Sequence, residues 1–479
     1  MWFNGNKNCV SELYSLYALI MQMIGERSIF YYNPNNRECN WSCYQQQNFT
    51  SQPTWVWHTQ LPHYTLKEQH NKEFFVLACL SEQLYKTELE GLLKSVSPLQ
   101  NVRVLIELAS LNKVPQEDYL ALDILKCLWR RSMLNLLLYF QHATTPLKLY
   151  SYKVFPQFTL IQQRLDFIKK PEDLFPNQLK DLKGYELRVL HGYSEPNTIL
   201  HRDASGKRHL SGFMWHFIKT FASNLGANLI PLHPTWRAGR LLSESHILEF
   251  TRNGTVDFGL VSASAKNIYK SLCLAQLYQL LIRRPEKTHI NSFEDLLESD
   301  LHIFGLRAEF DMLSDEFRAK YASAFRLTDS LAEFFRMRSS LNTSWAYSVT
   351  STKWILFEEQ QRHFQRPLFR YSDICLHGST PDSILLTDDS IYRGILKLYT
   401  MRTQQSGLLL HWMQHSLYDM VKAGKMQFKD YSTPIPMSPL NVEDFRLAWR
   451  CCCCGLFLAL FVFAVELLRF YVNVCLNHL

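Results

Sequence analysis

The sequence predicts an α/β protein that ends in a membrane-spanning helix. Two observations carry this prediction. Apolar strand-like runs alternate with amphipathic helix-like runs over most of the 479 residues, and the segment Cys451–Val465 contains no charged residue. Abundant aromatic residues, with 31 Phe, 23 Tyr and 11 Trp, together with few Gly and Pro, indicate an ordered chain that can bury a core.

The first α/β stretch covers residues 70–180 and alternates as a sheet with crossover helices does. The expected segments are, in order, a strand at Phe74–Leu80, a helix at Thr87–Val96, a strand at Val102–Leu108, a helix at Tyr119–Trp129, and a strand or helix end at Met133–Phe140. The polar, Pro-bearing segment Lys169–Gln178 is expected to be a linker.

Two further α/β stretches follow. The second begins at Tyr185 and is expected to contain a strand at Glu186–Leu190, a hairpin around Asp203–Arg208, a helix at Gly212–Leu225, and strands at Ala227–Leu232 and Val256–Ser262. The third, Ile290–Phe428, repeats the alternation. In it, Ser330-Leu-Ala-Glu333 has the pattern of a helix capping box.

The C-terminal apolar run predicts a helix that crosses a bilayer, with Cys451, Gly455, Phe461 and Val465 along it. A span needs about 20 residues, so Arg450 and Glu466 near its ends must reach the interface with their long side chains. Trp449 and Tyr471 stand where interfacial aromatic residues are expected. A buried core helix is the alternative interpretation.

Other features concern the compartment. The apolar segment Leu13–Gly25 is as short as a signal-peptide core, but Glu12 precedes it, so the sequence does not decide whether it is cleaved. The cysteines form no disulfide framework, although Cys39 and Cys43 could bridge each other or stay free. Glycosylation sequons occur at Asn40, Asn48, Asn253 and Asn342. If they are used, the body is extracellular and the C-terminus is cytoplasmic.

The sequence contains no pattern typical of an enzyme. It lacks a Gly-x-Ser-x-Gly elbow, a phosphate-binding loop and a Gly-rich dinucleotide turn, so no catalytic residue and no cofactor is predicted. No metal site is predicted either, because His411 and His415 are expected on a helix surface without further ligands. The formal charge of +7 is spread along the chain, which argues against a nucleic-acid partner.

Several short motifs occur in a fixed order. Gly184–Leu232 contains a strand, a Ser-Glu-Pro turn, Gly212 and a long helix, and Gly254–Gly259 reads Gly-Thr-Val-Asp-Phe-Gly. They are followed by Ile290–Leu296, Asp329–Phe335, Ala346–Thr352, Ser406–Trp412 and Leu440–Phe445. This order resembles the ligand-binding region of ionotropic glutamate receptors. Tyr347–Trp354, Tyr-Ser-Val-Thr-Ser-Thr-Lys-Trp, is similar to the divergent insect branch, the chemosensory ionotropic receptors.

The resemblance implies a two-lobed, periplasmic-binding-protein-like clamshell behind an N-terminal α/β domain. The implied parts are an N-terminal domain at 1–178, a first lobe at 179–267, a remnant of the pore region at 268–289, a second lobe at 290–440 and a membrane helix at 447–470. The implied ligand-contacting residues are Glu195, Pro196, Ser330, Thr350, Ser351 and Thr352. Ordinary roles are the alternatives: Ser330 as a helix cap, Thr350 inside a strand and Glu195 in solvent.

The chain departs from the family pattern at the ligand. The position before the Ser351-Thr352 pair, where the family has a carboxylate for the ligand's amino group, is Thr350. The family also has an arginine for the ligand's α-carboxylate after the Gly-x-Val-Asp strand, and Val261–Asn267 contains none. Burying a zwitterion without these counter-charges costs several kcal/mol, so glutamate is not the expected ligand.

A second departure concerns the pore. In the family, three membrane-associated segments separate the two lobes, whereas only residues 268–289 separate them here. The uncharged run Ser271–Ile282 would be about 18 Å long as a helix, too short to cross about 30 Å of hydrocarbon. Either the sequence lacks an exon or the product does not conduct ions.

These observations leave alternatives. The leading interpretation is a chemosensory receptor subunit of the ligand-gated ion channel type at the plasma membrane, which binds a small-molecule cue and assembles with co-receptor subunits. The alternative is a non-conducting, membrane-anchored binding or decoy subunit with the same clamshell. A membrane-anchored α/β enzyme is the third interpretation, and the lack of a catalytic constellation argues against it.

Overall fold

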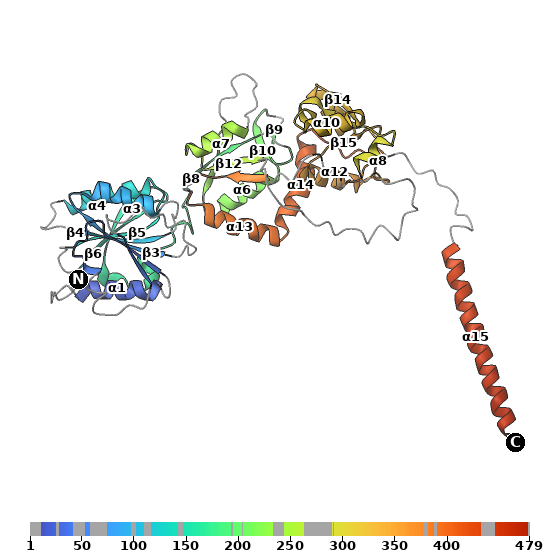
Figure 1. Cartoon of the computed structure of the whole chain (residues 1–479), viewed down its shortest axis with the longest axis horizontal. Helices are drawn as coiled ribbons and strands as arrows, with labels where there is room; N and C mark the ends of the chain where they lie inside the picture. The colour runs from blue at the N-terminus through green and yellow to red at the C-terminus, as the bar shows by residue number, and fades with distance from the viewer. Residues whose placement is uncertain are drawn as a thin grey trace. The chain divides into compact units, whose positions relative to one another are not determined.

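Figure 1 shows the computed structural model of the chain. It describes residues 11–24, 28–41, 53–57, 74–96, 102–109, 116–141, 147–192, 195–203, 205–232, 244–262, 290, 292–372, 374, 376, 382–387, 390–432 and 446–477. The region expected to be a pore remnant, 268–289, lies outside these residues, as do Asn48, Cys43 and the motif Leu440–Phe445.

A seven-stranded sheet with the order β2-β1-β3-β4-β5-β6-β7 forms the N-terminal domain. β1 to β5 pair in parallel, and β6 and β7 add antiparallel edge strands. The strands are β1 (Ser28–Tyr32), β2 (Thr54–Trp57), β3 (Phe74–Ser81), β4 (Arg103–Ala109), β5 (Asn135–Phe140), β6 (Lys148–Lys153) and β7 (Thr159–Arg164). The helices are α1 (Ser11–Ile24), α3 (Tyr85–Val96) and α4 (Glu117–Trp129).

Helices cover both faces of this sheet, which explains why its central strands are continuously apolar. All of β3 except its last residue is buried. In Figure 1, α3 and α4 lie over one face and α1 over the other. The predicted strands and helices of this stretch are confirmed, and Met133–Phe140, left open between strand and helix, contains β5.

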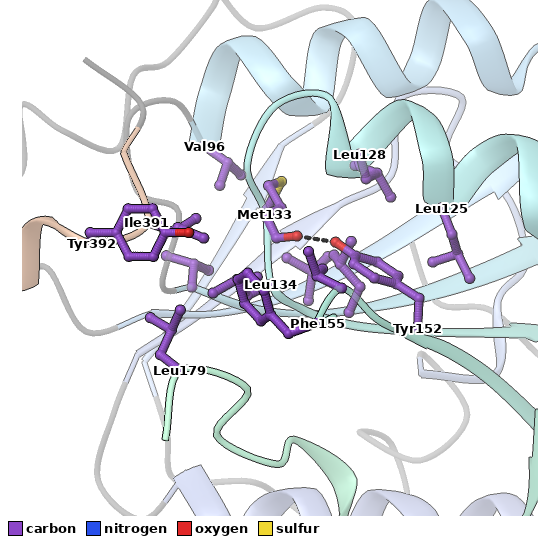
Figure 2. Close-up of a cluster of buried hydrophobic side chains, with 14 of the residues drawn as sticks. Val96, Leu125, Leu128, Met133, Leu134, Tyr152, Phe155, Leu179, Ile391 and Tyr392 are labelled. Atoms are coloured by element: carbon purple, nitrogen blue, oxygen red, sulfur yellow. Dashed lines mark hydrogen bonds between the residues drawn. The ribbon is translucent and has the colours of Figure 1, made fainter. Parts of the chain in front are cut away.

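Figure 2 shows the core on the α3 and α4 side of the sheet. The Tyr152 hydroxyl donates a hydrogen bond to the Met133 carbonyl within this apolar cluster. The same cluster contains Leu179, which follows the expected linker, and Ile391 and Tyr392 from a distant part of the sequence. Buried side chains from three separate segments therefore share one core.

One sequence expectation for this domain needs correction. The segment Lys169–Gln178 is not a plain linker, because it contains α5 (Pro171–Leu174) and because Leu174 and Phe175 are buried in the core beneath the sheet. Its last residue, Gln178, also donates from its amide to the backbone carbonyls of Leu134 and Tyr152. The apolar N-terminal segment is a core helix: α1 buries Leu13, Leu16 and Ile20 in the same cluster.

The next α/β unit, here called lobe 1, contains a four-stranded sheet with the order β11-β8-β12-β16. Its strands are β8 (Glu186–His191), β11 (Asn228–Leu232), β12 (Phe258–Ser262) and β16 (Asp382–Leu385), with a hairpin of β9 (Ile199–Arg202) and β10 (Arg208–Ser211). Its helices are α6 (Phe213–Asn224), α7 (Glu244–Arg252), α13 (Arg393–Gln405) and α14 (Leu408–Lys422). The predicted strands, hairpin and helix of this stretch are confirmed.

The chain then enters a separate small unit, here called lobe 2, built on the parallel sheet β14-β13-β15. Its strands are β13 (Ile303–Leu306), β14 (Phe325–Thr328) and β15 (Ala346–Tyr347). Its helices are α8 (Phe293–Leu297), α9 (Arg307–Phe310), α10 (Asp315–Tyr321), α11 (Leu331–Ser339) and α12 (Ser351–Gln361).

The connection between the lobes is the feature that defines this fold. After lobe 2 the chain returns to lobe 1, where β16 pairs antiparallel with β12. Lobe 1 is thus assembled from segments on both sides of lobe 2 in the sequence. The predicted α/β class with two lobes is confirmed.

The C-terminal segment forms the long helix α15 (Arg446–Asn477), drawn in red in Figure 1. Cys451, Gly455, Phe461 and Val465 all lie in it. In the described part of the chain, its window Cys452–Arg469 is the one segment long and apolar enough to cross a membrane, and protein covers none of it. The predicted C-terminal apolar helix is confirmed, and Leu, Phe and Val side chains are exposed along it.

Candidate ligand-binding site at the first turn of helix α12

Thr350, Ser351 and Thr352 lie together where α12 begins. Thr350 precedes the helix, and its Oγ1 accepts a hydrogen bond from the Lys353 amide at 3.3 Å. The Trp354 amide donates to the Thr350 carbonyl at 2.9 Å. Thr350 therefore has the position and the hydrogen bond of an N-cap residue and does not lie in a strand. Its hydroxyl also lies 3.1 Å from the Thr352 hydroxyl.

Ser330 caps the neighbouring helix α11, which was the ordinary role considered for it. Its hydroxyl accepts from the Glu333 amide at 3.2 Å. The predicted capping box is only half formed, because the Glu333 carboxylate accepts from the Thr328 hydroxyl at 2.6 Å and the Ser330 amide donates to that same hydroxyl oxygen. A complete capping box, which the sequence reasoning missed, opens α8 at Ser292 and Asp295.

Arg338 on α11 is the most unusual side chain near this site. It is only 9% exposed, and its guanidinium carbon lies 4.7 Å from the centre of the Phe334 ring and 5.2 Å from that of Phe335. Among the residues that the structure describes, no carboxylate forms an ion pair with it. Burial lowers the pKa of Arg338 to about 10, against the opposing effect of Glu309 and Glu195.

Lys353, in the first turn of α12, faces the same aromatic ring. Its Nζ lies 5.5 Å from the centre of the Phe335 ring. Burial, and then the positive charge of Arg338, lower the pKa of Lys353 to about 8, and Glu195 opposes this shift. Lys353 and Arg338 thus present two cations to one ring that is itself 46% exposed.

Glu195, predicted from the sequence, acts on both of these cations. Its carboxylate forms an ion pair with Lys425 just beyond α14. The turn that carries Glu195 packs closely against Gly212, where φ is +95°. A Cβ at this position would lie 2.6 Å from the Pro196 carbonyl oxygen. Only glycine allows this approach. Pro196 itself is buried.

The two cations and the ring were not found by sequence reasoning. Arg338 lies three and four residues after Phe335 and Phe334, the spacing at which helical side chains meet. Lys353 directly follows the Ser351-Thr352 pair. These spacings were visible in the sequence, but the contact between α11 and α12 was not.

The Gly-Thr-Val-Asp-Phe-Gly motif has a structural explanation. The Asp257 carboxylate accepts from the Arg188 amide at 2.8 Å and pairs with its guanidinium, which joins β12 to β8. A Cβ on Gly259 would lie 2.6 Å from the Thr251 hydroxyl, so glycine lets α7 pack against β12. The motif therefore builds lobe 1. The stretch after Ser262, where the family has its arginine, lies outside the described residues.

A pocket of about 450 Å³ lies elsewhere on lobe 1. Trp215, Lys219, Leu229 and Pro231 are among its lining residues, and none of the predicted ligand-contacting residues is. Within the described part of the chain, no cluster of His, Cys, Asp and Glu could hold a metal ion. His411 and His415 stack on each other along α14, with their ring centres 6.0 Å apart.

The cysteines and the sequons are placed as follows. Cys39 forms a disulfide with Cys79 in β3, so it neither bridges Cys43 nor stays free, the two alternatives considered from the sequence. Asn40 donates its backbone amide to the buried Glu107 carboxylate at 2.9 Å. Asn253 is exposed, and Asn342 is half-buried.

No protein-family model matches the sequence, and no curated protein matches it either. Solved structures that resemble the chain include a substrate-binding protein of an amino acid ABC transporter from Streptococcus pneumoniae bound to L-arginine, with 10% identity, 49% of this chain and 94% of that chain covered, and a TM-score of 0.31. The AvGluR1 ligand-binding domain in complex with glutamate is 15% identical in sequence, with 50% of this chain and 97% of that chain covered and a TM-score of 0.31.

A third similar structure is the ligand-binding domain of iGluR3 from Pleurobrachia bachei with glycine, at 13% identity, 50% and 99% coverage and a TM-score of 0.29. Similarity at this level does not identify what the present chain binds.

Proposed function

We propose that this chain is a membrane-anchored receptor subunit that binds a small chemical cue, of the chemosensory, ligand-gated ion channel type. The observation that carries the proposal is the double crossing of the chain between two lobes, with the candidate site at the start of α12 and a C-terminal apolar helix. Proteins with this connection bind ligands between lobes that close on them.

Two hydrogen bonds tie the end of α12 and the residues just after it to the segment that precedes α15 in the sequence. The Gln360 side chain donates to the Gln427 carbonyl at 2.7 Å. The Gln365 amide, just after the helix, donates to the Asp430 carboxylate at 2.9 Å. Residues 427–430 lie on the chain segment that leads to α15. A displacement of α12 by a ligand at its first turn would therefore pull on this segment.

The disulfide supports an extracellular body at the plasma membrane. Structural disulfides persist in oxidising compartments, and Cys39–Cys79 ties a loop to the central sheet of the N-terminal domain. The C-terminus would then be cytoplasmic. Glycan mapping checks this orientation: the exposed sequon at Asn253 should carry a glycan, while Asn40, held against Glu107, should not. An unmodified Asn253 in chains from a secretory-pathway host would contradict it.

Ion conduction is tested by expressing the full chain together with co-receptor subunits and recording cue-evoked currents. Asp430→Ala, which removes the Gln365 contact, should lower the maximal current without changing the half-saturating cue concentration. Glu358→Ala, at an exposed position of α12, serves as the matched control. Absence of any cue-evoked current would contradict the channel role.

The alternative, a non-conducting binding or decoy subunit, is favoured by the short segment 268–289. Sequencing the transcript between the codons for Asn267 and Ser271 distinguishes the two. Further codons for two or three apolar spans support the channel, and an uninterrupted junction supports the decoy. The proposed function includes no catalysis. Enzymatic turnover that is abolished by a substitution of one polar residue of the site would contradict this part of the proposal.

A further inference from the structure

Arg338 is a buried cation on which the Glu309 and Glu195 carboxylates act, but with which neither forms an ion pair. Its side chain is nine-tenths buried, two aromatic rings contact it, and within the described part of the chain no ion pair reaches it. Burying a charge without a counter-charge is costly, and proteins normally pair such groups. Ring contact compensates only part of this cost, because a cation over a ring gains about 0.5–2 kcal/mol.

The charges around Arg338 leave a positive excess. Lys425 adds a positive charge that acts on Lys353, while Glu309 acts on Arg338 and Glu195 acts on both Arg338 and Lys353. Glu195 already forms an ion pair with Lys425. The remaining two cations face the Phe335 ring from α11 and α12. Three cations thus face two carboxylates, Glu195 and Glu309, and in the described part of the chain neither carboxylate forms an ion pair with Arg338 or Lys353.

We propose that Arg338 and Lys353 hold the carboxylate of a small organic anion that has no amino group, with the ligand's apolar part on the Phe335 ring. The proposal rests on the proposed function, because it names the ligand class of the same site. A guanidinium can bind a carboxylate with two parallel hydrogen bonds. The Thr352 hydroxyl, 3.1 Å from the Thr350 hydroxyl, adds a polar group at the start of α12.

The same charges exclude a zwitterionic amino acid. An ammonium group beside Arg338 and Lys353 would meet two positive charges. Thr350 is neutral, and Glu195, the carboxylate that acts on both cations, is engaged by Lys425. An aromatic or aliphatic monocarboxylate avoids this repulsion and keeps the contact with Phe335. Its neutral alcohol analogue would leave both cations unpaired.

The experiment uses the full chain in lipid nanodiscs and isothermal titration with three probes of one shape: benzoate, benzyl alcohol and benzylammonium. Benzoate should bind saturably and at least tenfold more tightly than the other two. Arg338→Met and Lys353→Met should each weaken benzoate binding by about tenfold or more. The matched control Arg336→Met, an exposed arginine on the same helix, should leave it unchanged.

Benzoate binding that is no tighter than that of benzyl alcohol, equal binding in all three variants, or no binding of benzoate at all would overturn the proposal. The Lys353→Met variant keeps the test valid if Arg338→Met does not fold, because Lys353 is only partly buried. If benzyl alcohol binds as tightly as benzoate and Thr352→Val abolishes that binding, the ligand is not held as an anion, but the proposed receptor function is unaffected. Benzoate binding without any evoked current would contradict the channel role, but it would support the proposal that the ligand is a carboxylate.

Discussion

The Tyr139 hydroxyl donates a hydrogen bond of 2.7 Å to the Glu107 carboxylate in the middle of the N-terminal sheet. Glu107 is only 4% exposed and also accepts the backbone amide of Asn40. Burial raises its pKa from 4.5 to about 7, although these hydrogen bonds favour the charged form. The carboxyl group is thus held at a site that disfavours its charge.

This relationship predicts a pH dependence of stability. Between pH 4.5 and 7 the folded state keeps a proton on Glu107 that the unfolded state has lost, so the free energy of unfolding should fall as pH rises. The loss should be on the order of 3 kcal/mol and level off above pH 7. Urea unfolding of the N-terminal domain in the full chain measures it. Glu107→Gln should abolish the fall, and the exposed Glu90→Gln should keep it. An unchanged slope in Glu107→Gln would contradict the assignment.

The disulfide gives a second prediction. Cys39 and Cys79 are separated by 40 residues, and closing a loop of that length stabilises the folded state by about 4 kcal/mol through the entropy of the unfolded chain. Cys39→Ser should therefore lower the unfolding temperature and remove its sensitivity to a reductant. Cys127→Ser, a free cysteine in α4, should behave like the wild type. Peptide mapping that finds Cys39 linked to Cys43 would refute the pairing.

Lys353 gives a third prediction. Burial and Arg338 lower its pKa to about 8, with Lys425 acting in the same direction and Glu195 against it. Deprotonation above pH 8 removes one of the two cations, so benzoate affinity should decline between pH 7 and pH 9.5 by up to about tenfold. Lys353→Arg keeps its charge over this range and should show a flat profile. A decline of equal size in Lys353→Arg would assign the effect to another group.

The membrane helix gives a fourth prediction. Phe461 lies near the middle of Cys452–Arg469, where a lysine costs about 3 kcal/mol relative to an apolar residue. Phe461→Lys should raise the fraction of chain released by alkaline carbonate, whereas Leu468→Lys, near the end of the span, should have little effect because lysine reaches the interface there. Equal release of the two variants would indicate that α15 does not span.

Much of the fold could be predicted from the sequence, because its decisive patterns are local. β3, β4 and α6 stood out through continuous apolar runs or helical periodicity, and their bounds differ from the predictions by at most one residue at each end. The start of α12 was also predicted as part of the site. The Thr350-Ser351-Thr352 sequence resembles a family motif, and Thr350 caps the helix.

The missed features depend on contacts between distant segments. Cys79 looked like a core residue because β3 is apolar, and only the position of the loop after β1 brings Cys39 to it. The capping box predicted at Ser330 is only half formed, because the Thr328 hydroxyl, and not the Glu333 carboxylate, accepts the hydrogen bond from the Ser330 amide. Arg338 from α11 and Lys353 from α12 contact the same Phe335 ring, and no periodicity within either helix indicates that arrangement.

Hydrogen–deuterium exchange of the full chain, with and without saturating benzoate, tests most directly whether a ligand is held at the first turn of α12. We expect slowed exchange at the amides of Lys353 and Trp354 and in the turn of α11 that carries Arg338. Slowed exchange confined to α6 and β11, around the pocket lined by Trp215 and Leu229, would contradict the account.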